Sequence, residues 1–122
     1  MTSHTFAIRR ETLTAELRII VVRGELDLFA APELKEAISH ALTDDVRDLI
    51  VALTQTVFID SSGLAGLILA MKRAHSLGGR LVVIDAGGSV ARTVRVAGVD
   101  QILTIVGSRE AALAALGERE PR

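Results

Sequence analysis

The fold is decided by Phe58-Ile59-Asp60-Ser61-Ser62-Gly63-Leu64, the stretch that joins two strongly patterned segments of the chain. An apolar run, Leu49 to Leu53, precedes it, and Leu64 to Leu77 follows with apolar residues at helical spacing. An acid and two hydroxyls therefore lie where a buried strand gives way to a helix. In an open α/β sheet, function usually resides beyond the carboxyl ends of the strands. The free N–H groups of a helix's first turn also favour an oxygen-rich group there.

Strand-like and helix-like segments alternate along the rest of the chain. Alternating, β-branched or continuously apolar composition predicts strands over residues 4–10, 16–23, 48–53, 80–84 and 102–106. Apolar residues at helical period predict helices over residues 32–42, 64–77, 90–97 and 109–116. A turn over 11–14 would close a hairpin, and a loop over 54–59 would lead into the quoted stretch. The predicted fold class is α/β, a mixed sheet with an N-terminal antiparallel hairpin and about four helices.

The composition limits what the chain can be. At 122 residues it fits one domain, which we place at residues 1–117, with a frayed tail at 118–122. It has no cysteine, which excludes disulfides and thiolate metal sites and is typical of a reducing cytoplasm. The net charge of −1 indicates neither nucleic acid nor an anionic membrane as a partner, and no apolar run is long enough to span a bilayer. We expect a cytoplasmic protein with no metal, no cofactor of its own, no direct nucleic-acid partner and no membrane partner.

Glycines and short polar residues indicate where the elements end. Gly24 permits a tight bend at the end of the second strand, and Asp27 can accept backbone hydrogen bonds at the entry to the next helix. Ser89 and Ser108 are expected to cap the third and fourth helices. Gly78-Gly79 supplies a stop for the second helix.

Two interpretations of Asp60, Ser61 and Ser62 are open on local sequence. They can be helix-capping residues, each choice contributing about 1 kcal/mol, with Gly63 present only because the helix packs tightly. Against this, one cap needs one residue, and three polar groups precede an almost wholly apolar segment. The run 57–59, Val-Phe-Ile, indicates a loop with an apolar side, as a partner-binding surface would have.

The sequence resembles the STAS-domain anti-sigma factor antagonists. Asp-Ser-Ser-Gly-Leu at 60–64 follows an apolar strand, and Gly-Glu-Leu-Asp at 24–27 is a second match. The resemblance implies that Ser61 is phosphorylated, with Ser62 the less favoured residue, and that Asp27 lies near this site. The helix starts near Asp27 and Ser61 would then share one partner face. It would comprise Asp27, Phe29, Asp60, Ser61, Ser62 and Gly63. A lone Phe29 is otherwise more often a core residue.

The resemblance also implies a function. Unphosphorylated, the protein would bind an anti-sigma factor and so release a sigma factor. The anti-sigma factor would also be the serine kinase, supplying ATP and Mg²⁺, and a serine phosphatase would reset the switch. The chain departs from the family in one respect: Ala52 stands in the central strand where members often carry Asp or Asn. If that acid shapes the site, phosphorylation here would be slower or differently controlled.

Two other functions are weighed against this one. An enzyme would need a base near Ser61, but His75 falls about 20 Å along the same helix at about 1.5 Å per residue, and no nucleophile elbow or phosphate-binding loop is present. We therefore expect no catalysis. The alternative is a non-switching STAS scaffold, or an accessory subunit of a signalling complex or a transporter ATPase. A short chain with an intact Asp-Ser-Ser-Gly favours the antagonist.

Overall fold

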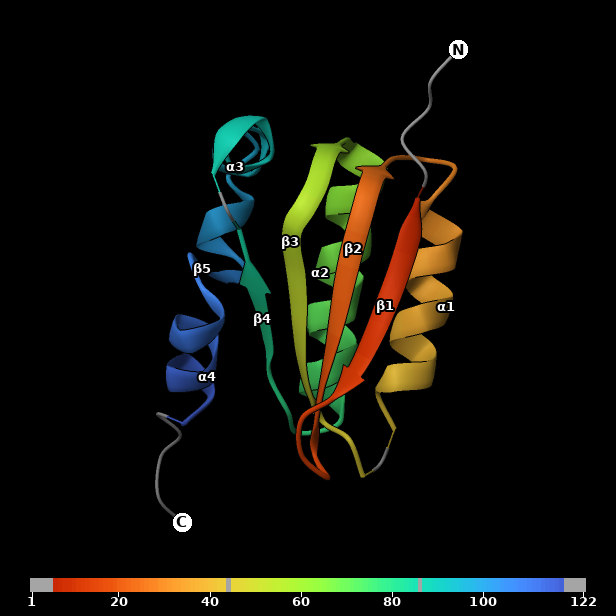
Figure 1. Cartoon of the computed structure of the whole chain (residues 1–122), viewed down its shortest axis with the longest axis vertical. Coiled ribbons are helices and arrows are strands. Elements are labelled where there is room, and N and C mark those ends of the chain that lie inside the picture. The colour runs from red at the N-terminus through yellow and green to blue at the C-terminus, as the bar shows by residue number, and fades with distance from the viewer. Residues whose placement is uncertain (1–5, 44, 86, 118–122) are drawn as a thin grey trace.

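The protein is a five-stranded mixed sheet with four α-helices, as the sequence predicted (Figure 1). This computed structural model describes residues 6–43, 45–85 and 87–117. The strands are β1 (Ala7–Thr12), β2 (Leu17–Leu26), β3 (Asp48–Ile59), β4 (Leu81–Ile84) and β5 (Thr104–Val106). The helices are α1 (Ala31–Ala41), α2 (Ser61–Ser76), α3 (Gly88–Val96), the 3₁₀ turn η1 (Val99–Gln101) and α4 (Arg109–Gly117).

The strands lie in the sheet in their chain order, β1-β2-β3-β4-β5. Only β1 and β2 pair antiparallel, while β2–β3, β3–β4 and β4–β5 are parallel. Each parallel pair is joined through a helix, because parallel strands need a crossover connection. The predicted hairpin and the predicted parallel pairing are therefore both confirmed.

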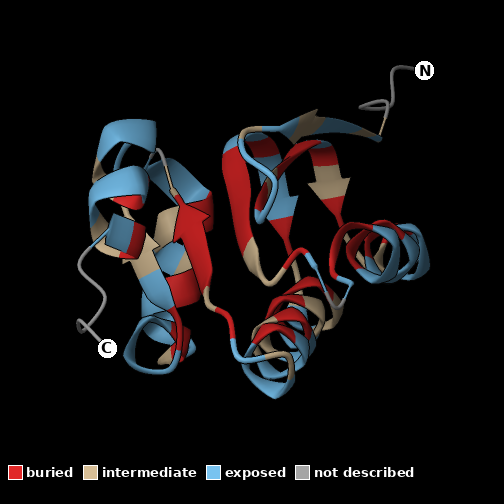
Figure 2. Ribbon diagram, turned by 90° about the horizontal axis from the view of Figure 1, so that it is seen from below, coloured by how far each residue is buried: buried red, intermediate tan, exposed pale blue. Residues whose placement is uncertain are grey.

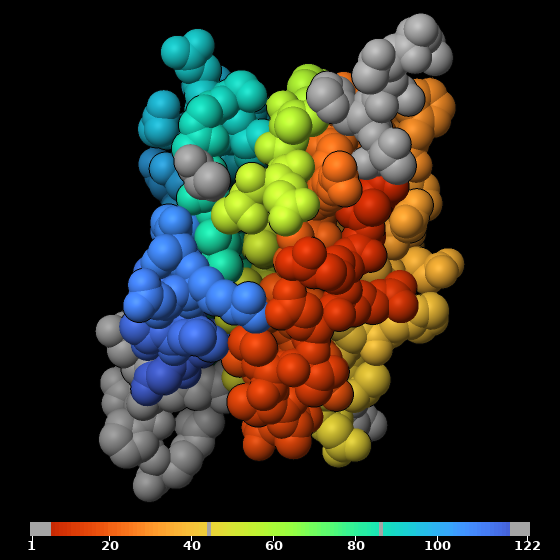
Figure 3. Space-filling view, in the orientation of Figure 1, coloured from red at the N-terminus to blue at the C-terminus, as the bar shows by residue number. Residues whose placement is uncertain are grey.

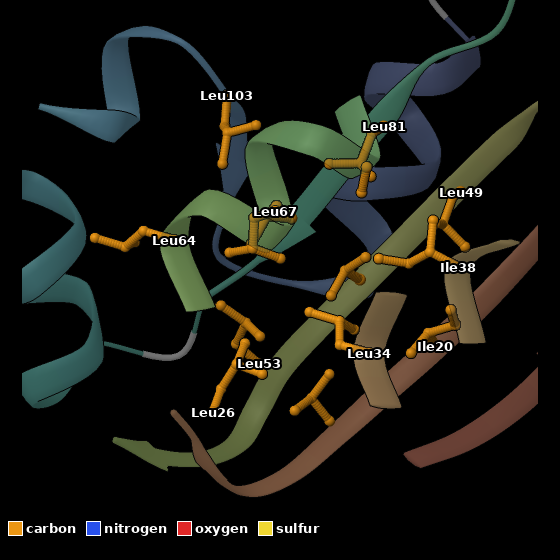
Figure 4. Close-up of a cluster of buried hydrophobic side chains, with 14 of the residues drawn as sticks. Ile20, Leu26, Leu34, Ile38, Leu49, Leu53, Leu64, Leu67, Leu81 and Leu103 are labelled. Atoms are coloured by element: carbon orange, nitrogen blue, oxygen red, sulfur yellow. The ribbon is translucent and has the colours of Figure 1, made fainter. Parts of the chain in front are cut away.

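Helices cover the two faces of the sheet unequally. One face packs against α1, α2 and α3, and the buried sides of α1 and α2 turn toward it (Figure 2). Figure 4 shows Leu34 and Ile38 of α1 and Leu67 of α2 within this cluster. The second apolar cluster, on the opposite face, takes its helical residues from α4, with Ala112 and Leu116 buried in it and Ala115 packed against it. Most of the buried side chains on that face therefore come from the strands and not from a helix.

The first hairpin is shifted from its predicted position. β1 runs to Thr12, which pairs with Arg18, so the turn lies at 13–16 rather than 11–14. His4, the predicted first residue of this strand, lies outside the described residues. Gly24 does not end β2 as expected: with φ of 97°, it lies where the β2–β3 register shifts, and the strand continues to Leu26. Glycine takes this φ without strain, so Gly24 forms a bulge inside the strand.

The predicted loop over 54–59 is wrong, because β3 continues as a strand to Ile59. Its second half pairs with the extension of β2, and Thr56 is buried, donating its hydroxyl proton to the Val22 carbonyl oxygen at 2.8 Å. Val57 and Phe58 are exposed while Ile59 is buried. The apolar stretch before Asp60 is therefore the end of a strand and not a loop.

Smaller differences concern the helix ends. Ser89 is not a cap: α3 begins at Gly88, its N-cap is Gly87, and no side chain caps it. Ser108 caps α4 as predicted, its Oγ accepting from Ala111 N at 3.1 Å. The strand predicted over 102–106 begins only at 104, because Ile102 N and Leu103 N both donate to the Val99 carbonyl oxygen and so continue the turn of η1. The predicted tail, 118–122, lies outside the described residues.

Candidate functional site

The candidate site lies at the carboxyl ends of β2 and β3. Leu26 and Ile59 are register partners there, and Asp60 N donates to the Leu26 carbonyl oxygen at 3.3 Å. The β2–α1 loop and the start of α2 therefore leave the sheet side by side. This is the position where open α/β sheets usually bind their ligands and partners.

Asp60 connects these two segments with one carboxylate. As the N-cap of α2, its Oδ1 accepts hydrogen bonds from Ser62 N at 2.9 Å and Gly63 N at 3.1 Å. Its Oδ2 accepts from Leu28 N, in the β2–α1 loop, at 3.2 Å. The capping interpretation is thus confirmed for Asp60. It does not account for the two serine hydroxyls.

Ser61 and Ser62 differ in exposure. Ser61 is the first residue of α2 and is exposed, whereas Ser62 is half-buried. Neither hydroxyl has a hydrogen-bond partner among the residues that the structure describes. A hydroxyl without an internal partner can be modified without breaking a contact of the fold, and Ser61 is the more accessible of the two.

Gly63 lies beneath the site rather than on it. It is buried, and a Cβ built on it would lie 2.5 Å from the Leu26 carbonyl oxygen and 2.8 Å from Ile59 Cγ1. Any side chain would therefore push the start of α2 away from the strand ends. This close approach explains the glycine in the Asp-Ser-Ser-Gly sequence.

Asp27 shapes the neighbouring loop. Its Oδ1 accepts from Phe29 N at 3.1 Å and Ala30 N at 3.0 Å, although the N-cap position of α1 belongs to Ala30. The loop that it holds carries Leu28, which is 63% exposed, and Phe29, which is 89% exposed. The core alternative for Phe29 is therefore wrong.

Sequence reasoning missed part of this surface. Glu25 and Glu33 line a cavity of about 200 Å³ together with Asp27 and Phe29, which gives the loop an acidic side. Leu28 was also missed. The available signal was the adjacent pair Leu28-Phe29, which precedes the apolar stripe of the following helix and has no place in it.

The histidine considered as a catalytic base does not lie at this site. His75 is exposed in the last turn of α2, about 21 Å from Ser61 at about 1.5 Å per residue. Across residues 6–43, 45–85 and 87–117, no group of three or more His, Cys, Asp or Glu side chains could hold a metal ion. No helix within the same ranges is long and apolar enough to cross a membrane.

Ala52 does not face this site. Its side chain belongs to the second apolar cluster, on the sheet face that α4 partly covers, whereas α1 and α2 pack against the other face. An acid at position 52 would therefore point away from α2. No direct contact between position 52 and Ser61 supports the expectation that Ala52 changes the rate or control of phosphorylation.

Comparison with known proteins places this geometry among related domains. A family model described as "STAS domain" matches residues 9–112. The anti-sigma-B factor antagonist of Staphylococcus aureus (strain NCTC 8325 / PS 47) is 26% identical over 86 residues, covering 70% of this chain and 80% of that protein. The crystal structure of an anti-sigma factor antagonist from Mycobacterium paratuberculosis superposes with a TM-score of 0.84 at 24% identity, covering 93% of this chain and 96% of that one.

The anti-sigma factor antagonist SpoIIAA has been solved in two forms that share the fold. Its unphosphorylated form superposes with a TM-score of 0.70 at 22% identity, covering 93% of this chain and 100% of that chain. The phosphorylated form from Bacillus gives a TM-score of 0.67 at 24% identity, covering 89% and 98%. At these identities, the superpositions establish a common fold.

Proposed function

Because the chain belongs to the STAS domain family, we propose that it is an anti-sigma factor antagonist switched by phosphorylation of Ser61. Unphosphorylated, it binds an anti-sigma factor and so frees a sigma factor. The anti-sigma factor is also the serine kinase that modifies it. The anti-sigma factor antagonists among its relatives support the binding function.

One observation carries the choice of Ser61. The hydroxyl is exposed at the first position of α2, while both oxygens of the carboxylate beside it accept hydrogen bonds that hold the helix start and the β2–α1 loop. Asp60 is therefore the helix cap, and the side chain of Ser61 is exposed to solvent. Ser62, half-buried in the first turn, is the less favoured phosphorylation site.

The surface around Ser61 suits a protein partner. Leu28 and Phe29 on one side, and Val57 and Phe58 on the other, expose apolar surface at the same end of the sheet. Buried aromatic side chains often dominate binding energy, so Phe29 is the expected anchor. Asp27, Glu25 and Glu33 add negative charge. The complementary partner surface is apolar, with basic side chains opposite Glu25, Asp27 and Glu33 and none opposite Ser61.

Phosphorylation would oppose this contact. A phosphoserine carries about −1.5 to −2 charges at pH 7, and it would place them beside Asp60 and close to the acidic loop. Bulk and the cost of desolvating that charge act against docking. A loss of about 4 kcal/mol would weaken binding roughly a thousandfold.

The fold itself should tolerate the phosphate. The positive end of the α2 dipole favours an anion at this position, even though Asp60 already occupies the N–H groups of Ser62 and Gly63. A phosphorylated relative with the same fold is consistent with this expectation. The switch therefore requires no large movement of the domain.

In this mechanism the protein is a ligand and a substrate, not a catalyst. The kinase supplies ATP and Mg²⁺, a separate serine phosphatase removes the phosphate, and the chain needs no cofactor. We place this cycle in the cytoplasm, with no direct contact to nucleic acid or membrane. Incubation with ATP alone is expected to leave the protein unmodified, and self-phosphorylation seen by mass spectrometry would contradict this.

The decisive experiment combines kinase labelling with calorimetry. The anti-sigma kinases of the source genome are incubated with the protein, ATP and Mg²⁺, and the modified residue is located by mass spectrometry. Ser61→Ala should bind its kinase with wild-type affinity and take up no phosphate, while Ser62→Ala, the matched control, should still be labelled. Labelling that persists in Ser61→Ala and disappears in Ser62→Ala would move the site to Ser62.

Calorimetry tests the charge switch separately. Ser61→Asp should fold normally and bind the kinase much more weakly than wild type. If Ser61→Asp and the phosphorylated protein both bound the kinase as tightly as the unmodified wild type, the proposed charge switch would be wrong. Binding by no anti-sigma factor at all would instead favour the scaffold or transporter-subunit alternative.

A further inference from the structure

The sheet face opposite the helix pair α1–α2 carries a small cavity that the proposed function does not use. Figure 3 looks onto this face, where the start of α4 (blue) reaches across toward β1 (red). The cavity has a volume of about 150 Å³. Its floor is apolar and is formed by Ile19, Val21, Ala52 and Ile84.

Two arginines stand at the rim of this cavity. Arg109, at the start of α4, and Arg9, on β1, both line it, with Ser108, Thr54 and Gln55 as further polar lining residues. None of the residues lining it is an acid. The rim is therefore polar and cationic above an apolar base.

The positive charge at the rim is only partly neutralised. Glu11 accepts from Arg109 Nη2 at 2.7 Å and from Arg9 Nη2 at 3.2 Å, so one carboxylate serves two guanidinium groups. The hydrogen bond from Arg109 is the main reason why the pKa of Glu11 lies below its usual value. Each guanidinium has five N–H donors, so both retain donors, and the three groups together carry a net charge of about +1.

We propose that this cavity binds a small monocarboxylate with a compact apolar body, such as an aromatic or branched short-chain acid. A cavity of about this size accommodates a benzene-sized group. A carboxylate matches the remaining single charge and pairs with guanidinium in a planar, two-pronged geometry. Position 52 is an alanine, and its small side chain leaves room above the floor of the cavity.

Benzoate is the probe for the experiment, and amide chemical shifts of the full chain are the readout. Benzoate should cause saturable shifts centred on Ala52, Ile84 and Ser108, and benzyl alcohol, which lacks the charge, should bind roughly tenfold more weakly or worse. No saturable shift with benzoate would overturn the proposal. Equal affinity for both probes would overturn the anionic part of it.

Variants separate this site from general surface binding. Ala52→Leu fills the cavity without changing its charge and should abolish the shifts, and the smaller change Ala52→Val should weaken binding if the leucine variant does not fold. Arg109→Gln should weaken benzoate binding roughly tenfold. Arg73→Gln, an exposed arginine on α2, is the matched control and should bind as wild type does. Undiminished binding in both Ala52→Val and Arg109→Gln would also overturn the proposal.

Discussion

The connections that leave the carboxyl ends of β2 and β3, a loop in one case and Asp60 alone in the other, use an aspartate in different ways. Asp27 accepts hydrogen bonds from two N–H groups of its own loop, and the residues that follow it are exposed. Asp60 accepts from two N–H groups of α2 and from Leu28 N of the neighbouring loop. The Asp27 loop therefore presents apolar side chains, whereas Asp60 holds both this loop and the start of α2. Under the proposed function, we expect partner affinity to come mainly from the Asp27 loop and regulation from Ser61, the residue beside Asp60.

Gly63 gives the strongest test of how closely the start of α2 packs against the ends of β2 and β3. Gly63→Ala should destabilise the fold by roughly 2–3 kcal/mol, because the added methyl group collides with the Leu26 carbonyl oxygen. Gly66→Ala is the matched control in the same helix, where the nearest atom to the new methyl is Leu34 Cδ2 at 3.4 Å. It should be neutral or stabilising by up to about 1 kcal/mol. Equal urea midpoints for the two variants would contradict the close-approach argument.

Phe29 tests whether the first loop provides affinity. Phe29→Ala should lower affinity for the anti-sigma factor by about 2 kcal/mol, close to thirtyfold, as expected of an aromatic anchor. Its effect on stability should stay within about 0.5 kcal/mol because the side chain is exposed. Calorimetry and thermal unfolding measure the two quantities. A large loss of stability with unchanged affinity would reverse the assignment.

The two aspartates can be compared directly by stability. Asp60→Ala should cost about 2 kcal/mol, since it removes a cap and leaves Leu28 N without its acceptor. Asp27→Ala should cost about 1 kcal/mol, because only its own loop loses a partner. Denaturant unfolding of both variants decides the order. A larger loss of stability for Asp27→Ala would show that Asp27, and not Asp60, is the main residue that holds the two connections in place.

A carboxylate outside both loops should give the smallest effect. The hydrogen bond from Arg109 lowers the pKa of Glu11 from its ordinary value of 4.5. A lowered pKa in the folded state adds stability above the unfolded pKa and loses it as pH falls through the folded value. The melting temperature of Glu11→Gln should therefore lie slightly below wild type near about pH 7, and the gap should close in acid. A gap independent of pH would contradict the ion pair.

The central part of the fold was predictable because its residues admit few alternatives. Continuous apolar runs such as 49–53 have to be buried on both sides, and the helical spacing after Leu64 gives α2 its inward face. Boundaries were less predictable where pairing overrides local preference. The polar residues Thr54 to Thr56 suggested a loop, yet the bulged extension of β2 keeps them in the sheet.

The sequence by itself determined the α/β class, the hairpin, and the placing of Asp60, Ser61 and Ser62 at a helix start, because periodicity and capping are local properties. Only the tertiary structure decided which of these residues is the cap and which hydroxyl is outward. It also brought Leu28 N to Asp60 and placed Ala52 on the far face of the sheet. These outcomes depend on which strand ends meet and which face a side chain takes. Long-range pairing settles both.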